Sequence, residues 1–292
     1  MTRASGWPAA STQVAAVIGD PVEHSLSPVI HNAAFTALDL DWIYLAFAVG
    51  VGEVPDAITG ARTLGLAGLS VTMPHKATVA AEMDRLSATA TRLGAVNTVI
   101  RTGSKLDGES TDGDGFLAAL RLDEGWEPAG RDCVVLGAGG AARAVILALA
   151  EAGAASVSVV ARQAASAAAA ARLAGPVGDV APVEAVSDAE LVVNATPVGM
   201  SVVDDGELQG LPLGMDPSRL GPGQLVVDLI YSPPSTPLLE AARAGGARVA
   251  NGLGTLIHQA ALQFRLWTGM DPPLEVMSAA ALGAITAPQH AG

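Results

Sequence analysis

The chain has 292 residues, half of them apolar, and its 16 Lys and Arg against 29 Asp and Glu give a formal net charge of −13. This length predicts one large or two ordinary domains, and the apolar content excludes a disordered chain. The acidic balance argues against nucleic-acid binding, because a surface that binds a duplex neutralises its phosphates with clustered Lys and Arg. The single cysteine, Cys133, can form neither an internal disulfide nor a Cys-based zinc site, so we expect a cytoplasmic protein.

Membrane insertion is not expected from the apolar segments. Residues 1–11 contain no apolar core of the kind that secretory signals have. The most apolar stretch, residues 144–161, is interrupted by Glu151 and Gly153 and is too short for a membrane span.

Short β-branched segments alternate along the chain with longer Ala- and Leu-rich segments, which is typical of α/β folds with largely parallel strands. In the first part of the chain, the pattern predicts strands at 14–18, 41–48 and 68–71, a hairpin over 95–108, and helices at 28–38 and 77–90. Ser27 and Pro28 are residue types preferred at a helix N-cap and at the first helical position. We expect this first compact unit to close near residue 112.

A second unit is expected after the Gly/Trp/Pro segment at 125–130. The pattern predicts strands at 133–136, 156–160, 191–194 and 225–229, helices at 141–152 and 164–173, a long loop at 198–224, and C-terminal helices at 252–269 and 273–286. The overall prediction is a two-domain α/β protein.

The segment Gly137-Ala138-Gly139-Gly140-Ala141 joins a buried strand to a helix, which is the context of a dinucleotide site, although a plain tight turn would read the same. The following strand ends beside Arg162, with no acid to hold the ribose 2′-hydroxyl of NAD. A guanidinium offers a fork of donors to a 2′-phosphate, so the sequence favours NADP unless Arg162 is only a solvated surface residue.

Polar residues also gather beyond the strands of the first unit, where open α/β sheets bind ligands. Together with the glycine turn, these segments closely resemble the shikimate dehydrogenase family from about Val17 to Gln259. The motifs that carry the resemblance are His-Ser-x-Ser-Pro-x-x-His-Asn at 24–32, Val-Thr-x-Pro-x-Lys at 71–76, Gly-Ala-x-Asn-Thr at 94–98, Thr-Asp at 111–112, the glycine turn, Asn-Ala-Thr-Pro-x-Gly-Met at 194–200 and Asp-x-x-Tyr at 228–231.

The resemblance implies a substrate-binding domain of residues 1–113 completed by residues 252–292, a Rossmann-like NADP-binding domain of residues 114–251, and an active-site cleft between them. It also implies NADPH-dependent reduction of 3-dehydroshikimate to shikimate in aromatic amino acid biosynthesis. By match to the motifs, Lys76 and Asp112 form the catalytic pair. Substrate binding is implied for Ser25, Ser27, Thr72, Asn97, Tyr231 and Gln259, and cofactor binding for Gly137, Ala138, Gly139, Gly140, Ala141, Arg162, Thr196, Met200 and Gly252.

Elementary chemistry agrees with the catalytic assignment. Hydride transfer to a carbonyl carbon leaves negative charge on the oxygen, and an ammonium group such as that of Lys76 stabilises this charge and supplies the proton. A neighbouring carboxylate, Asp112, keeps the ammonium charged and positioned. His24, His31 and His75 lack the acid or thiolate spacing of a metal site, so no metal is expected.

Two departures from the family pattern affect the details. Ser166 stands where the family commonly has a second basic residue for the NADP phosphate, so NAD remains an alternative cofactor, and Ser110 stands where Asn usually precedes Thr-Asp. The alternatives in function are a quinate or aminoshikimate dehydrogenase, and a non-catalytic ligand-sensing module on the same fold. The expected partner is the small-molecule substrate, in a monomer or a homodimer.

Overall fold

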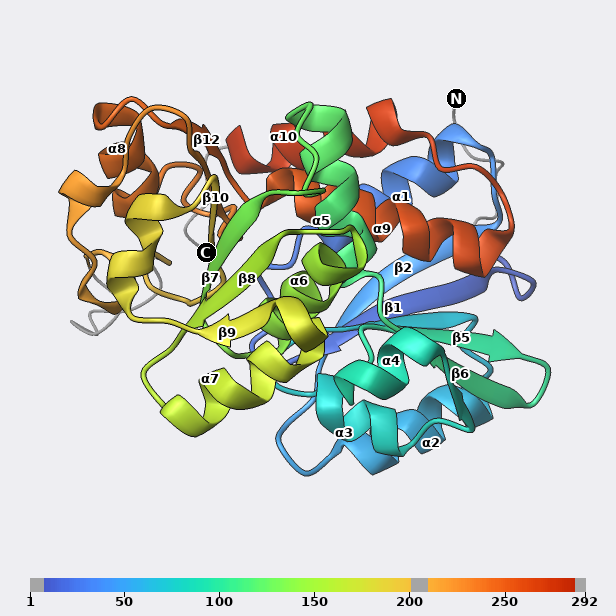
Figure 1. The fold of residues 1–292 in the computed structure, drawn as a ribbon. Coiled ribbons are helices and arrows are strands. Elements are labelled where there is room, and N and C mark those ends of the chain that lie inside the picture. Colours follow the sequence, from blue (N-terminus) through green and yellow to red (C-terminus); the bar gives the residue numbers. More distant parts are fainter. Residues whose placement is uncertain (1–7, 201–209, 287–292) are drawn as a thin grey trace. The chain divides into compact units, whose positions relative to one another are not determined.

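The computed structural model describes residues 8–200 and 210–286, so the N-terminal segment and the long loop considered above lie partly outside the described residues. The chain divides into two compact units, one of residues 1–111 and 257–292 and one of residues 112–256. Each unit is built on a six-stranded sheet with flanking helices, as the alternating pattern predicted (Figure 1). None of the helices in the described ranges is long and apolar enough to cross a membrane.

The sheet of the first unit has the strand order β2-β1-β3-β5-β6-β4. Its elements are β1 (Gln13–Gly19), α1 (Ser27–Ala37), β2 (Trp42–Ala48), α2 (Val54–Leu64), β3 (Gly68–Val71), α3 (Lys76–Ala81), β4 (Arg85–Leu86), α4 (Ala88–Leu93), β5 (Thr98–Thr102), β6 (Lys105–Glu109), most of α9 (Leu253–Thr268) and α10 (Leu274–Thr286). Strand β1 pairs in parallel with both β2 and β3, and β5 is antiparallel to β3 and β6. The predicted hairpin and the first three strands are therefore present.

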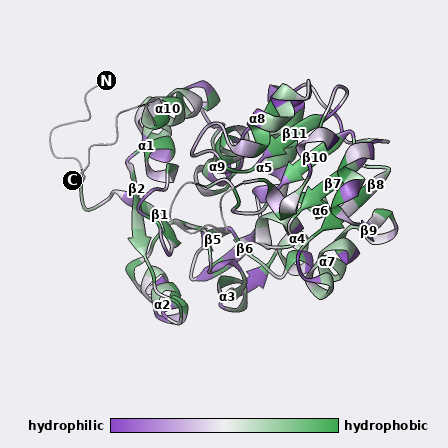
Figure 2. Cartoon of the chain, turned by 90° about the vertical axis from the view of Figure 1, so that its left-hand side faces the viewer, coloured by the Kyte–Doolittle hydropathy of each residue, from purple (hydrophilic) through white to green (hydrophobic). Residues whose placement is uncertain are grey.

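Apolar residues of the first unit alternate between the two faces of its sheet. One face packs against α2, α3 and α4, with Ile58 and Val79 among the buried residues of that core. On α1, Phe35 contacts Trp42 of β2 and Phe264 of α9, with ring centroids 5.3 and 5.5 Å apart. The view in Figure 2 shows α1 and α10 on one side of β1 and β2 and α2 on the other.

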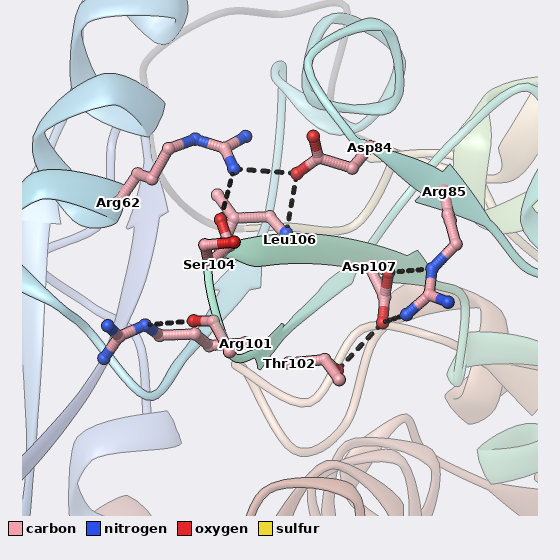
Figure 3. Close-up of polar contacts among 9 residues, drawn as sticks. Arg62, Asp84, Arg85, Arg101, Thr102, Ser104, Leu106 and Asp107 are labelled. Carbon is pink, nitrogen blue, oxygen red and sulfur yellow. Dashed lines mark hydrogen bonds and ion pairs between the residues drawn. The ribbon is translucent and has the colours of Figure 1, made fainter.

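The helix predicted at 77–90 is wrong in its middle part, where the chain leaves α3 and forms β4 before α4 begins. Asp84 causes the interruption, because its backbone N–H donates to the Leu106 carbonyl at 2.9 Å and its carboxylate accepts from the Leu106 N–H at 2.8 Å. Arg62 adds an ion pair to Asp84 at 2.7 Å, and Arg85 forms a bidentate pair with Asp107 (Figure 3). These tertiary contacts outweigh the local sequence preference for a helix. They also lower the pKa of Asp84, chiefly through the Leu106 hydrogen bond.

His31 of the family motif is a core residue of the first unit. Its ring is buried, stacks on Tyr44 at 4.5 Å and lies 5.1 Å from Trp267. Neither ring nitrogen has a hydrogen-bond partner within the described part of the chain. Burial lowers the pKa of His31 to about 3, so the ring stays neutral in the folded protein.

We expect His31→Phe to reduce the loss of stability in acid. The folded-state pKa lies below the ordinary 6.5, so the unfolded state alone binds the proton as the pH falls. The contribution of the neutral ring is complete above pH 6.5 and decreases by about 1.4 kcal/mol per pH unit below it. Urea unfolding of both proteins between pH 5 and 8 checks this: parallel curves would contradict it, and a smaller acid slope in the variant would support it.

The sheet of the second unit is entirely parallel, in the order β12-β11-β10-β7-β8-β9. Its elements are α5 (Asp112–Ala118) with a π-helical turn at Ala119–Asp123, β7 (Asp132–Leu136), α6 (Gly140–Glu151), β8 (Ser156–Val160), α7 (Ala164–Ala171), β9 (Gly178–Val180), β10 (Leu191–Asn194), β11 (Leu225–Asp228), α8 (Pro237–Ala244) and β12 (Arg248–Ala250). Short 3₁₀ turns lie at Arg172–Val177, Val183–Asp188, Pro212–Gly214 and Pro217–Arg219.

Strands of the second sheet are buried on both faces, as parallel strands covered by helices are. In β7, Cys133 and Val135 pack into the core under α6, while Val134 and Leu136 pack into the core under α8. The hydrophobic colour of β7, β8, β10 and β11 in Figure 2 reflects this double burial. Burial also raises the pKa of the Cys133 thiol to about 12, so that thiol has no chemical role at neutral pH.

Candidate active site

The substrate residues predicted for the first unit lie where the strand order reverses around β1. Strand β2 lies on one side of β1 and β3 on the other, so the segments that follow β1 and β3 leave the sheet side by side. The Thr72 N–H donates to the Ile18 carbonyl at 3.0 Å, and a Cβ on Gly19 would come within 2.3 Å of the Thr72 side chain. Gly19 is therefore required for the close contact between these two segments. Ligands of open α/β sheets bind at such a point.

Ser25 and Ser27 form the entry to α1, but not in the arrangement predicted. The N-cap position is Leu26 and Ser27 is the first helical residue, so the prediction of Ser27 as N-cap is wrong. Instead, the Ser25 hydroxyl accepts the Ser27 N–H at 3.3 Å. The Ser27 side chain is buried and lies close enough to the Tyr44 hydroxyl to affect its pKa. The two serines place hydroxyls at the positive end of an 11-residue helix, which suits a carboxylate.

Lys76 is the first residue of α3, and its backbone is fixed on two sides. Its carbonyl accepts the Val96 N–H at 2.9 Å, which joins it to the segment before Asn97. The preceding residue, His75, is buried with Nε2 2.6 Å from the Val49 carbonyl, so Nε2 carries the proton. His75 therefore anchors the Lys76 loop.

Asn97 and Gln259 meet beside the end of β3. The Asn97 oxygen accepts the Thr111 N–H at 2.8 Å, and its Nδ2 donates to Thr111 Oγ1 at 3.0 Å and to Gln259 Oε1 at 3.4 Å. Both amides are buried. Gln259 lies on α9, so the C-terminal helix completes the first unit's site. Asp112 follows Thr111 directly and begins α5 of the second unit.

The glycine turn of the second unit has the geometry that the dinucleotide motif predicts. Gly137 has φ +117°, and a Cβ there would lie 3.0 Å from the Ala195 carbonyl, so only glycine fits between β7 and the loop after β10. At Gly139 a Cβ would meet nothing within 4 Å. The exposed residues Gly139, Gly140 and Ala141 begin the 12-residue helix α6. A close backbone approach and an open helix N-terminus fit a pyrophosphate.

Arg162 is exposed two residues beyond the end of β8, the strand next to β7. Ser166 stands on the first turn of α7, where its hydroxyl donates to Gln163 Oε1 at 3.2 Å. The neighbouring position therefore supplies a hydroxyl and no second cation.

Asn194 and Asp228, which stand in the family motifs but were not predicted as site residues, connect the loops that carry the remaining predicted cofactor residues. Asn194 and Asp228 end the neighbouring strands β10 and β11 in register. Asp228 accepts from Asn194 Nδ2 at 3.0 Å, from the Ile230 N–H at 3.1 Å and from Thr236 Oγ1 at 2.7 Å. The Asn194 oxygen accepts both the N–H and the hydroxyl of Thr196. The carboxylate thus links the loop that carries Thr196 and Met200 to the loop that carries Tyr231.

Burial has a clear electrostatic effect in this pair of loops. It raises the pKa of Asp228 to about 6 in spite of the three donors, and it raises the pKa of Tyr231. Gly252 is buried beside them, where a Cβ would lie 2.0 Å from the Leu229 carbonyl. The sequence signal that could have identified the link is a polar residue ending two otherwise apolar strands, Leu-Val-Val-Asn and Leu-Val-Val-Asp.

Within each unit, therefore, the predicted residues on segments that follow strands lie at one edge of the sheet, and Asp112 lies at the start of α5. The first unit brings together Ser25, Ser27, Thr72, Lys76, Asn97 and Gln259, and the second holds Asp112, Tyr231, the glycine turn, Arg162, Thr196, Met200 and Gly252. Among the described residues, no group of three or more His, Cys, Asp or Glu could hold a metal ion. The parallel sheet with its glycine turn in one unit, and the buried amides and Lys76 loop in the other, are the features of a nucleotide-dependent dehydrogenase.

Comparisons with known proteins narrow that class. Residues 17–99 match the shikimate dehydrogenase substrate binding domain, and residues 252–282 match the shikimate 5′-dehydrogenase C-terminal domain. A relative from Geobacter metallireducens, called shikimate dehydrogenase (NADP(+)), is 43% identical over 94% of this chain and 97% of its own length. The chain belongs to the shikimate dehydrogenase family. The predicted family, the two-domain α/β fold and the oxidoreductase class are thereby confirmed.

Solved structures agree with this placement. A shikimate dehydrogenase crystallised in complex with NADP+ superposes with a TM-score of 0.89 at 37% identity, covering 96% of this chain and 98% of its own. A quinate dehydrogenase from Corynebacterium glutamicum in complex with NAD reaches 0.83 at 31% identity, covering 93% and 99%. The predicted cofactor, NADP, agrees with the relatives' names, whereas the ring substrate varies among proteins of this fold.

Proposed function

We propose that the protein interconverts 3-dehydroshikimate and shikimate with NADP(H), the biosynthetic direction being reduction. The observation that carries the proposal is the set of groups at one edge of the first sheet: helix-borne hydroxyls at Ser25 and Ser27, buried amides at Asn97 and Gln259, and the Lys76 loop. A carboxylate, neutral ring hydroxyls and a reacting carbonyl are the features of a hydroxylated ring acid. We assign substrate binding to residues 1–113 with 252–292 and cofactor binding to residues 114–251.

Lys76 and Asp112 have the acid–base role in this proposal. During reduction, the Lys76 ammonium donates a hydrogen bond to the carbonyl oxygen and supplies its proton as negative charge develops there. During oxidation the same amine accepts the hydroxyl proton. Asp112, at the start of α5, orients the Lys76 side chain in both directions of the reaction.

The second unit holds the cofactor in this proposal. The N–H groups of Gly139, Gly140 and Ala141 at the start of α6 bind the pyrophosphate, and Arg162 faces the 2′-phosphate. When bound, the nicotinamide supplies or accepts the hydride. Thr196, Met200 and Gly252 shape its pocket, and Tyr231 contributes to the substrate carboxylate site.

Steady-state assays with the full chain test the proposal. We expect shikimate with NADP+ to give the highest kcat/KM among the four combinations of shikimate or quinate with NADP+ or NAD+. Because oxidation releases a proton, the reaction is followed at neutral to alkaline pH by NADPH absorbance. With one cation at the 2′-phosphate position, the preference for NADP+ over NAD+ is expected to be smaller than in relatives with two.

Two results would overturn the assignment in different ways. Faster turnover of quinate would make the protein a quinate dehydrogenase of the same fold. Binding of shikimate without reduction of either cofactor would favour the sensing module, although the presence of Lys76 and Asp112 argues against it, because a sensor has no use for a proton donor.

A further inference from the structure

A buried chain of hydrogen bonds runs through the first unit behind the proposed substrate site. The Tyr44 hydroxyl donates to Ser70 Oγ at 2.6 Å, and the Ser70 hydroxyl donates to Gln263 Oε1 at 2.7 Å. Gln263 Nε2 donates to Thr98 Oγ1 at 3.0 Å, whose hydroxyl donates to Asn97 Oδ1 at 2.7 Å. All five residues are at most 6% exposed. The chain connects β2, β3 and α9 and ends at the Asn97 amide.

Two backbone groups determine the direction of every bond in this chain. The Thr111 N–H can only donate, so the Asn97 side-chain atom 2.8 Å from it must be the amide oxygen. The Asn97 backbone carbonyl can only accept, so the Gln263 atom 3.3 Å from it must be the amide nitrogen. Gln263 therefore turns its oxygen to Ser70, Ser70 must donate to it, and the Tyr44 proton is committed to Ser70.

These hydrogen bonds fix the orientation of the Asn97 side-chain amide, so that its nitrogen can donate on one side only. Its oxygen already accepts from the Thr98 hydroxyl and from the Thr111 N–H. A flipped amide would set its nitrogen against the Thr111 N–H and its oxygen against Gln259 Oε1. The amide nitrogen is therefore the group offered on the Gln259 side, where its 3.4 Å hydrogen bond is longer than the 3.0 Å bond that it donates to Thr111.

The other end of the chain reaches the carboxylate region. Ser27 lies close enough to the Tyr44 hydroxyl to affect the pKa of that group. Because the Tyr44 proton is committed to Ser70, the Tyr44 oxygen can only accept a hydrogen bond from its surroundings. One network thus extends from the neighbourhood of a serine at the start of α1 to the amide beside β3.

Resting on the proposed function, we propose that Tyr44, Ser70 and Gln263 are positioning residues for the substrate. They hold the Asn97 amide so that its nitrogen donates to a ring hydroxyl oxygen, and the far end of the same network, at Tyr44, lies near Ser27. None of the three is a catalytic residue, and their effect is on recognition of a neutral hydroxyl group. An oriented hydrogen bond of this kind in a buried site discriminates between substrates because an unpaired partner is costly.

Two variants of Gln263 separate positioning from general packing. Gln263→Met keeps the volume of the side chain but removes its hydrogen-bonding oxygen and nitrogen. We expect this variant to raise the KM for shikimate about 10-fold, with kcat within about 3-fold of wild type and an unchanged KM for NADP+. Gln263→Glu keeps the acceptor toward Ser70. When protonated its carboxyl also supplies the missing donor, so the glutamate variant should approach wild type in acid and resemble the methionine variant in alkali.

In wild type, the titratable neighbours of the network do not change state between pH 6 and 9. Burial lowers the pKa of His31 to about 3 and raises the pKa of Tyr44 above its usual range. The ratio of the shikimate KM of the glutamate variant to that of wild type, measured from pH 6 to 9, therefore reports the ionisation of residue 263. The ratio cancels the titration of the catalytic pair, which both proteins share.

Gln224 provides a matched control. It is also a buried glutamine whose Nε2 donates to two backbone carbonyls, those of Val186 and Ala189, but it lies in the second unit. Gln224→Met should cost comparable stability and leave the KM for shikimate unchanged. Equal effects of the two methionine variants, or a pH-independent KM ratio for Gln263→Glu, would overturn the proposal.

Tyr44→Phe keeps the proposal testable if the Gln263 variants do not fold. It removes one hydroxyl, and we expect a rise of about 3- to 10-fold in the KM for shikimate. An unchanged KM would contradict the network. Wild type that turns over no shikimate would instead refute the proposed function, which distinguishes the two failures.

Discussion

Replacing Lys76 by methionine is expected to lower kcat for shikimate oxidation by about 10²- to 10⁴-fold, the range for loss of a positioned acid–base group. The shikimate KM should change much less, because the ammonium interacts most strongly with charge that develops in the transition state. Methionine keeps the length and the apolar stem of lysine. The Lys76 backbone bond to Val96 is retained in the variant, so the loop should remain in place. Stopped-flow and steady-state measurements of NADPH formation give both constants.

The control for Lys76 is the chain's other lysine, Lys105, which is exposed at the start of β6. Lys105→Met removes the same charge from the same unit and should leave kcat unchanged. Partial restoration of the Lys76→Met rate by added methylamine would show that the missing group is an amine. A loss of less than about 10-fold in kcat would exclude Lys76 as the acid–base residue.

Most strands of both sheets could be predicted because their signal is local, whereas the two- and three-residue strands β4, β9 and β12 were not predicted. Segments such as Leu-Val-Val-Asn at 191–194 and Ser-Val-Ser-Val-Val at 156–160 have the bounds predicted from their β-branched runs. The turn at Gly137 was also recognised, since a glycine there is required by a positive φ and a close backbone contact. Helix α2 and the break after α3 were not predicted. The break depends on hydrogen bonds between Asp84 and Leu106, which is 22 residues away, and the helix propensity of the local segment does not reflect such a contact.

The candidate site divides in the same way. Residues that touch ligands in the proposal, such as Ser27 and Lys76, stand in motifs next to predicted strand ends and could be named from the sequence. The residues that hold them could not, because their partners are distant: Ser70 and Gln263 are 193 positions apart, and Asn194 and Asp228 are 34 apart. Hydroxyl and amide side chains show no preference for a partner until the fold brings one within reach. The residues proposed to contact ligands could therefore be predicted from the sequence, whereas the residues that hold them in position could be identified only in the structure.

Replacing Asp228 by asparagine is expected to weaken NADP+ binding about 10-fold and to lower the stability of the second unit. The carboxylate accepts from Asn194, Thr236 and the Ile230 N–H, and an amide in its place turns an NH₂ group toward at least one of these donors. A buried donor without a partner costs about 1–3 kcal/mol. Asn194 in turn holds Thr196, so the loop proposed to shape the nicotinamide pocket should loosen. Fluorescence titration of NADPH and calorimetric unfolding measure the two effects.

The pH dependence of stability distinguishes the buried Asp228 carboxylate from an ordinary surface carboxylate. The folded-state pKa of Asp228 is about 6, above its ordinary 3.8, so the folded protein binds a proton that the unfolded chain has released. The stability from that proton is complete below pH 3.8 and is lost as the pH rises through 6, a change of about 3 kcal/mol. Asparagine cannot titrate, so the difference in unfolding free energy between wild type and Asp228→Asn should be largest near pH 4 and smaller by pH 7.

The exposed Asp216, which accepts from Ser218, is the matched control in the same unit. Asp216→Asn should leave NADP+ affinity unchanged, and a gap for Asp228→Asn that widens with rising pH would show that the carboxylate is ionised and favourably paired at all these pH values.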